Sequence, residues 1–162
     1  MKYLLMFLMI AMPYTAMAKD KSTLIYEPSL PLSLAQKMAS ACIAWQSKNK
    51  ISNLAIAIFN QDAQLIYFIR MDGVSIGVSE VAMKKAESAS KFRFSTRDTM
   101  GWIQGNPGVA TFDSIAGIIG GLPISTQSGK PLGGIGVSGA SADDDEKCAQ
   151  AALDAVKLEL VD

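Results

Sequence analysis

Blocks of apolar and polar residues predict helices at both ends of a folded region, with strands between them. Residues 54–59 form a continuous apolar run of strand length, 60–62 form a polar turn, and 64–70 form a second run rich in Ile, Tyr and Phe. Two such runs joined by a short turn predict a β-hairpin. Before them, apolar residues at three- and four-residue spacing predict a helix from Ser33, with Ser33 and Gln36 as a capping box. Its apolar face comprises Leu34, Met38, Ala41, Cys42 and Trp45.

The second half of the chain predicts two more helices, a second hairpin and a C-terminal helix. Residues 79–92 have a helical face of small residues, and a short helix restarts at Ser95-Thr96, with Trp102 anchoring its apolar side. Residues 104–122 are Gly-rich and irregular, with one short strand predicted over 111–115. Runs at 123–126 and 132–137 predict the second hairpin. The acids at 143–145 open the last helix, where negative charge complements the helix dipole.

This element order predicts an α+β fold. Hairpins imply an antiparallel sheet, and the amphipathic helices must cover it. The helices at the two ends are expected to lie side by side on one face, which would bring Cys42 near Cys148. The two cysteines can form a disulfide that closes a long loop, or they can be two small buried apolar residues, and the sequence leaves both open.

The first 18 residues have the pattern of a secretory signal peptide. Lys2 precedes a nine-residue apolar run over 4–12, and Ala16-Met17-Ala18 supplies an A-x-A cleavage site. The run is too short to cross a bilayer, which takes about 20 apolar residues. We therefore expect residues 1–18 to be a signal peptide, 19–31 an extended N-terminal arm and 32–162 the folded domain. The mature protein is expected to be periplasmic or secreted, with no stable membrane anchor.

Composition narrows the chemistry. The chain has 15 Lys and Arg against 15 Asp and Glu, a pI of about 6.3, and no histidine. A nucleic-acid binder normally carries a basic patch, so no nucleic-acid partner is expected. Without histidine the chain lacks the usual general base at neutral pH and the commonest metal ligand. These features favour a binding protein over a catalyst.

The segment 134–139 has the form G-x-G-x-x-G, the dinucleotide-binding fingerprint. The fingerprint requires a βαβ unit, whereas here the last helix has no strand after it, and its three aspartates would repel a pyrophosphate. Close backbone packing and a tight turn are the simpler interpretation. A further interpretation is that these glycines let a flat ligand lie against the backbone.

Cationic groups are the remaining candidates for a binding site. Arg70 ends the first hairpin beside Asp72, Lys84 and Lys85 are adjacent on a predicted helix, and Arg97 follows Ser95-Thr96 at a helix N-terminus. Each group has an ordinary structural explanation, as a surface pair, a solvated lysine or an N-cap. Together they point to a pocket for an anionic or flat ligand.

From about Leu32 onward the chain resembles the GlcG/HbpS-like family, often described as haem-binding or haem-degrading. The resemblance lies in the order and spacing of five segments, 70–73 (RMDG), 82–89 (AMKKAESA), 92–97 (FRFSTR), 120–123 (GGLP) and 133–139 (GGIGVSG), with Asp145 and Ala149 behind the last. It implies a profilin-like α/β/α sandwich, a homo-oligomer that is often an octamer, and binding of haem or another tetrapyrrole in sensing, uptake or scavenging. Ser88 stands where the family usually has Thr, and Ser95 replaces a Pro.

The resemblance also implies a set of ligand-binding residues, namely Arg70, Asp72, Lys85, Ser88, Thr96, Arg97, Gly121 and Pro123. Cations would hold haem propionates, and glycines at 120–121 and 133–139 would admit the flat macrocycle. With no histidine, iron ligation would fall to Thr96, Tyr67, a Met, a Lys or water. Two alternatives remain: a pocket or enzyme for a small 2-hydroxy acid, in which Arg70, Lys85 and Arg97 clamp a carboxylate, and an oligomeric scaffold.

Overall fold

The computed structural model describes residues 28–161, in which four helices flank a four-stranded antiparallel sheet. The predicted signal peptide and most of the predicted N-terminal arm, residues 19–31, lie outside the described residues. The strands are β1 (Ala55–Asn60), β2 (Leu65–Arg70), β3 (Gly121–Ser125) and β4 (Pro131–Ser138), in the spatial order β2-β1-β4-β3. The α-helices are α1 (Leu32–Asn49), α2 (Ile76–Phe92), α3 (Thr96–Gly105) and α4 (Ala142–Val156), and a short 3-10 helix η1 spans Pro107–Thr111.

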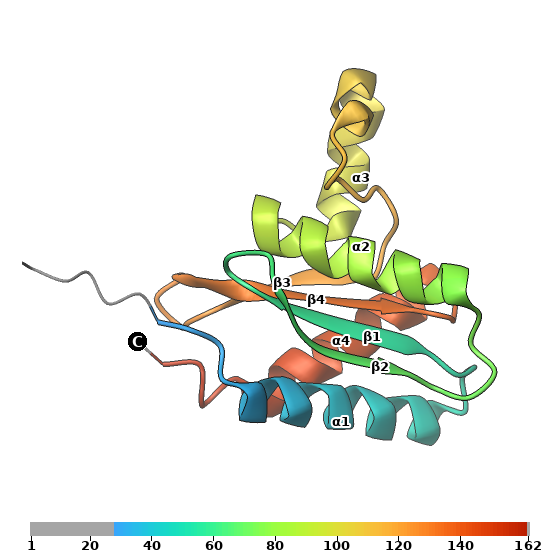
Figure 1. The fold of residues 1–162 in the computed structure, drawn as a ribbon, viewed down its shortest axis with the longest axis vertical. Coiled ribbons are helices and arrows are strands. Elements are labelled where there is room, and N and C mark those ends of the chain that lie inside the picture. The colour runs from blue at the N-terminus through green and yellow to red at the C-terminus, as the bar shows by residue number, and fades with distance from the viewer. Residues whose placement is uncertain (1–27, 162) are drawn as a thin grey trace, which may run out of the picture.

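The helices form a layer on each face of the sheet. In Figure 1, α2 crosses one face while α1 and α4 cover the other. The larger core lies on the α1 and α4 side, where Ile56, Ile58 and Ile135 are fully buried together with Met38 and Val156. The α+β prediction of an antiparallel sheet with helices on both faces is therefore confirmed.

The opposite face has very little room between α2 and the sheet. A Cβ atom added at Gly136 of β4 would lie 2.2 Å from the Ala82 oxygen and 2.4 Å from the Ala86 nitrogen, both in α2. At Gly134, an added Cβ would lie 2.4 Å from the Ala86 oxygen. The small-residue face of α2 and the glycines of β4 thus let two backbones pack directly against each other. This is the close packing that the sequence favoured over a dinucleotide site.

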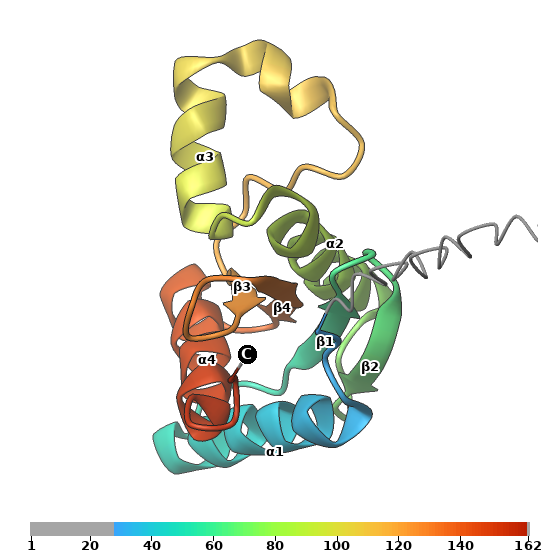
Figure 2. The ribbon, with the colours of Figure 1, turned by 90° about the vertical axis from the view of Figure 1, so that its left-hand side faces the viewer.

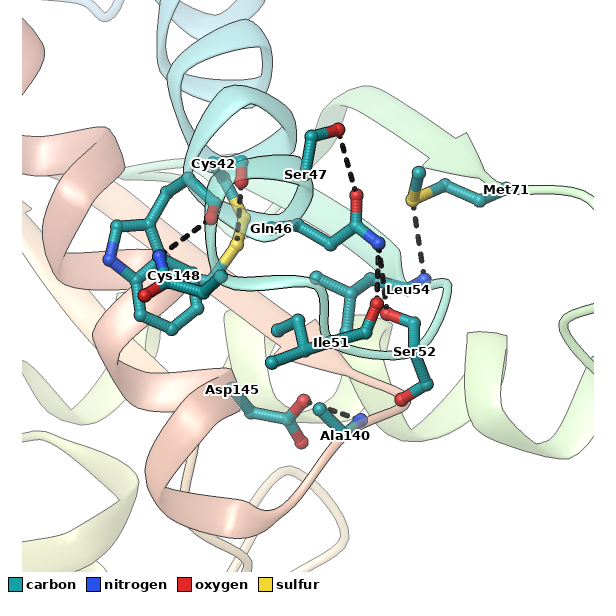
Figure 3. Close-up of a disulfide and its surroundings, with 12 residues drawn as sticks. Cys42, Gln46, Ser47, Ile51, Ser52, Leu54, Met71, Ala140, Asp145 and Cys148 are labelled. Carbon is teal, nitrogen blue, oxygen red and sulfur yellow. Dashed lines mark hydrogen bonds between the residues drawn. A yellow bond between two sulfur atoms is a disulfide. The ribbon is translucent and has the colours of Figure 1, made fainter.

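The helices at the two ends of the domain lie side by side, as predicted, and a disulfide joins them (Figure 3). Cys42 of α1 and Cys148 of α4 are both fully buried, and their Cα atoms are 4.7 Å apart. The bond links positions 106 residues apart, so it connects the first and last helices of the domain directly.

Three local predictions were wrong. The first helix begins at Leu32 with Pro31 as its N-cap, so the Ser33–Gln36 capping box does not form. The second begins at Ile76 rather than at 79, because the Ser75 hydroxyl accepts a hydrogen bond from the Val78 N–H. No strand forms over 111–115, where η1 ends in a segment that has no neighbouring strand to pair with.

A segment that we call the arm, residues 94–120, leaves the sandwich after α2 and returns at β3. Figure 2 shows α3 and η1 standing away from the sheet, with an irregular stretch leading back to it. Several large apolar side chains of the arm are exposed, namely Phe94, Trp102, Phe112 and Ile118. Trp102 was predicted to be an apolar anchor, but it is 42% exposed because the arm has no layer above it. No helix in residues 28–161 has both the length and the apolar character needed to cross a bilayer.

Candidate functional site

Lys85, predicted to bind ligand, is one of the most deeply buried side chains in the described structure, at 1% exposure. It lies on the inward face of α2, and its Nζ donates to the Val137 carbonyl of β4 at 2.7 Å and to Asp145 Oδ2 of α4 at 2.9 Å. Burial lowers the pKa of Lys85 and raises that of Asp145, and the hydrogen bond between them opposes both shifts. Lys85 therefore ties α2 to the sheet and to α4, and at 1% exposure its ammonium is not accessible to an external ligand in the single chain.

Ser88 and Thr96 also act on the protein itself, at the base of the arm. The buried Ser88 hydroxyl accepts a hydrogen bond from the Ala116 N–H at 3.0 Å. The fully buried Thr96 Oγ1 accepts one from the Gly121 N–H at 2.8 Å. These bonds fix the return of the chain from the arm into β3, and they remove Thr96 as an accessible iron ligand.

Arg97 projects from the first turn of α3 toward the N-terminal end of α4. Its Nε donates to Glu146 Oε2 at 2.9 Å, and its Nη2 pairs with both Glu146 and Asp143. The Arg97 guanidinium lowers the pKa of Asp143 below its usual value. Arg97 therefore anchors the start of the arm to α4, and the Nε and Nη2 edge of its guanidinium is already paired with carboxylates.

The remaining predicted residues lie at separate places. Arg70 ends β2 at one edge of the sheet, and Pro123 lies in β3 at the other edge. Three strand spacings of about 4.8 Å separate these edges by roughly 14 Å. Asp72 lines a cavity of about 410 Å³ at the start of α2, whereas Pro123 lines a different one of about 250 Å³ beside α4. The structure thus does not gather the predicted set into one pocket, and Arg70, Lys85 and Arg97 do not form a common carboxylate clamp.

The expectation that glycines leave room for a flat macrocycle is wrong for a single chain. The space beside Gly134 and Gly136 is occupied by α2. A Cβ atom at Gly120 would lie 2.8 Å from Lys85 Nζ, and one at Gly121 would lie 2.6 Å from Thr96 Cγ2. These glycines admit protein atoms, so a flat ligand must bind elsewhere.

The arm offers a different site. Phe94, Asp98 and Trp102 line a hollow of about 310 Å³, within the range of small-molecule pockets. Phe94 is 52% exposed, and the other two side chains are also exposed, so the hollow is open to solvent. Arg93 precedes Phe94 and is exposed as well. A flat apolar ligand with acidic substituents would find aromatic contact and a nearby cation here.

Local structure holds Asp98 in place within this hollow. Ser95 is the N-cap of α3, and its Oγ accepts from the Asp98 N–H at 3.0 Å. The same hydroxyl donates to Asp98 Oδ2 at 2.6 Å. Within residues 28–161, Asp98 Oδ1 has no hydrogen-bond partner. The hollow therefore has one anchored carboxylate with a free oxygen.

Asp98 was not among the residues predicted to bind ligand, and Trp102 was predicted only to be an apolar anchor. The missed signal was the four-residue spacing of Asp98 and Trp102, which puts them about 40° apart on α3, with Phe94 just before the N-cap of that helix. The spacing does not reveal whether these side chains are buried. They are exposed because the arm projects from the sandwich. Among the described residues no group of three or more His, Cys, Asp or Glu could hold a free metal ion.

Residues 30–154 match the family model described as "Haem degrading protein HbpS-like". No curated protein sequence matches the chain.

Solved structures share this fold. A crystal structure of HbpS aligns with a TM-score of 0.76 and 27% identity, covering 85% of this chain and 96% of that one. The Klebsiella pneumoniae protein ORFY aligns with a TM-score of 0.74 and 23% identity, covering 87% and 97%. A PduOC:haem complex aligns with a TM-score of 0.71 and 21% identity, covering 79% and 95%. The last two, below 25% identity, bear on the fold alone.

Proposed function

The chain belongs to the HbpS-like haem-degrading family, and from this we propose that it is a haem-binding protein that holds the tetrapyrrole in the hollow of its arm. The observation that carries the proposal is the pair of exposed aromatic side chains, Phe94 and Trp102, that line one hollow. Aromatic rings left in water on a projecting arm are costly unless something covers them.

The residues around the hollow suit haem in three respects. Phe94 and Trp102 offer ring faces and edges to a flat aromatic macrocycle. Arg93 is an exposed guanidinium that can pair with a propionate, because it has no salt bridge to a residue in 28–161. The hollow is open rather than enclosed, so we expect reversible binding of modest affinity. When bound, haem would supply a redox-active iron.

We propose binding rather than turnover as the main activity. The arm hollow is lined by Phe94, Asp98 and Trp102, with no second acidic or basic group among its lining residues. Proton transfer during oxidative breakdown would need such a group held against the macrocycle. The family description leaves room for degradation, which would appear as loss of the Soret band in the presence of a reductant.

Export and assembly belong to the same proposal. The sequence pattern of residues 1–18 favours a periplasmic or secreted protein, where haem sensing, uptake or scavenging would take place. A disulfide between α1 and α4 suits an oxidising compartment. The exposed Phe112 and Ile118 of the arm favour a homo-oligomer, for which an octamer is our specific proposal.

The test is a hemin titration of the purified protein followed at the Soret band. We expect saturable binding that Trp102→Ala weakens about tenfold, the equivalent of about 1.4 kcal/mol for one lost aromatic contact. Phe68→Ala is the control, since it removes an exposed aromatic side chain of β2 that does not line the hollow. An unsaturable, linear response in the unaltered protein would refute haem binding. Equal affinity in Trp102→Ala would move the site elsewhere.

The buried motif residues need separate treatment in this test. Lys85→Ala and Thr96→Ala remove fully engaged side chains, so a loss of haem binding in either would reflect the fold. Their thermal stability must be measured alongside. The small-acid alternative is tested by thermal shift with 2-hydroxy acids, for which we expect no stabilisation, because Arg70, Lys85 and Arg97 do not converge on one pocket.

A further inference from the structure

We infer that Asp98 provides the protein's axial ligand to the iron when ferric haem occupies the arm hollow. The inference rests on the haem binding proposed above. It concerns a residue that the sequence motifs do not mark as a ligand.

Position is the first argument. Asp98 and Trp102 are four residues apart on α3 and therefore lie on one side of that helix, and Phe94 comes just before its N-cap, Ser95. The three side chains line one hollow. A macrocycle that contacts both aromatic rings in this hollow would therefore lie against the Asp98 carboxylate.

Orientation is the second argument. The Ser95 hydroxyl holds Asp98 Oδ2 at 2.6 Å, and the helix N-cap holds the Asp98 backbone. This leaves Oδ1 without a hydrogen bond to any residue in 28–161. A carboxylate with one oxygen held and the other free is pre-organised to donate a lone pair, since little rotamer freedom remains to be lost on binding.

Chemistry is the third argument. Ferric iron is a hard cation that accepts anionic oxygen ligands, as the tyrosinate ligand of catalase haem illustrates. The macrocycle supplies four nitrogen ligands, so one protein side chain is enough, and no cluster of ligating residues is needed. Asp98 Oδ1 would form a bond to iron by displacing a water molecule from the axial position. No electron is transferred, and the released water returns to solvent.

Other candidate ligands are already committed elsewhere. Thr96 is fully buried and bonded to Gly121, and Lys85 is buried in its pair with Asp145. Tyr67 packs against the main core from β2, on the body of the sandwich rather than on the arm. Met71 Sδ accepts a hydrogen bond from the Leu54 N–H. Among these residues and Asp98, only Asp98 lines the arm hollow.

The experiment compares two tetrapyrroles that differ only in the metal, ferric hemin and metal-free protoporphyrin IX. Asp98→Asn keeps an oxygen for the Ser95 hydroxyl but loses the anionic donor. We expect it to weaken hemin binding about tenfold or more while leaving protoporphyrin IX binding unchanged. The high-spin charge-transfer band of bound ferric hemin should also shift, because the axial donor changes. Asp98→Glu, which restores a carboxylate, should recover part of the hemin affinity.

Asp113→Asn is the matched control, because it removes another exposed acid of the arm outside the hollow and should bind both tetrapyrroles normally. Hemin binding by Asp98→Asn at full affinity with an unchanged spectrum would overturn the inference while leaving the proposed function intact. Equal losses for hemin and protoporphyrin IX would also overturn it, because they would assign Asp98 to the pocket wall. If the unaltered protein binds neither tetrapyrrole, both proposals fail.

Discussion

Lys85 Nζ lies 2.9 Å from Asp145 Oδ2, in an ion pair that joins helices on opposite faces of the sheet. The pair is nearly inaccessible, with side-chain exposures of 1% and 4%. The Val137 carbonyl and the Ala140 N–H supply further hydrogen bonds, so each charged group has two partners. The lysine of the family motif is therefore part of the domain's framework.

Replacing Lys85 with Met should destabilise the domain strongly. The variant leaves the Asp145 carboxylate buried without its cation, and breaking such a pair typically costs about 3–5 kcal/mol. Lys84→Met is the control, since Lys84 is exposed and adjacent and should change the free energy of unfolding by less than about 0.5 kcal/mol. Urea denaturation of both variants checks this. Equal stabilities would show that the buried pair contributes little.

The same pair predicts a particular pH dependence. Burial raises the folded-state pKa of Asp145, so its contribution to stability is fully present below about pH 3.9, its unfolded value, and is lost as pH rises through the folded value. Lys85 has the opposite dependence. Burial lowers its folded-state pKa, so its contribution to the free energy of unfolding grows as the pH rises toward the ordinary pKa of lysine.

The measurement is the free energy of unfolding from pH 3.5 to 7 for the unaltered protein and for a Lys85→Met, Asp145→Leu double variant. The difference between them should move in favour of the unaltered protein as the pH falls. A difference that moves the other way would mean that Asp145 has a depressed pKa in the folded state. The apolar double variant is the right reference because it leaves no unpaired buried charge.

The order of elements could be predicted because it depends on local signals. Apolar runs and turns specified both hairpins, and spacing specified the helices, so the antiparallel sandwich and the proximity of Cys42 to Cys148 could be inferred. The errors were at boundaries, where one hydroxyl decides the outcome: Ser75, rather than a later residue, caps α2. They also included the strand over 111–115, because a strand needs a neighbour and the arm offers none.

The binding site was harder to predict because residue type does not reveal burial. Lys85 and Thr96 look like ligand-binding groups in the sequence, yet both are satisfied by backbone and side-chain partners inside the fold. Phe94 and Trp102 look like core residues, yet they line an open hollow. The exposure of Phe94 and Trp102 follows from the arm leaving the sandwich, and the burial of Lys85 follows from the packing of α2 against the sheet. Both are long-range properties.

The Cys42–Cys148 disulfide should contribute substantially to stability. It closes a loop across a separation of 106 residues, for which chain entropy gives up to about 4–5 kcal/mol. We expect a Cys42→Ala, Cys148→Ala double variant to show a lower free energy of unfolding by roughly 2–5 kcal/mol. The bond itself is checked by mass spectrometry without reductant. A mass 2 Da above that expected for the oxidised protein would show free thiols and contradict the structure.

Two glycines provide the last prediction, with opposite signs. In Gly136→Ala the new Cβ would lie 2.2 Å from the Ala82 oxygen, a backbone atom that cannot rotate away, so α2 must shift from the sheet. We expect a loss of at least about 1–3 kcal/mol. Gly101→Ala puts the same methyl in open space on α3, where removing a helical glycine should add about 0.5–1 kcal/mol. Melting temperatures of the two variants should therefore fall on opposite sides of that of the unaltered protein. Tolerance of alanine at position 136 would show that α2 and β4 are less closely packed than the structure has them, and would restore that face as a place for a flat ligand.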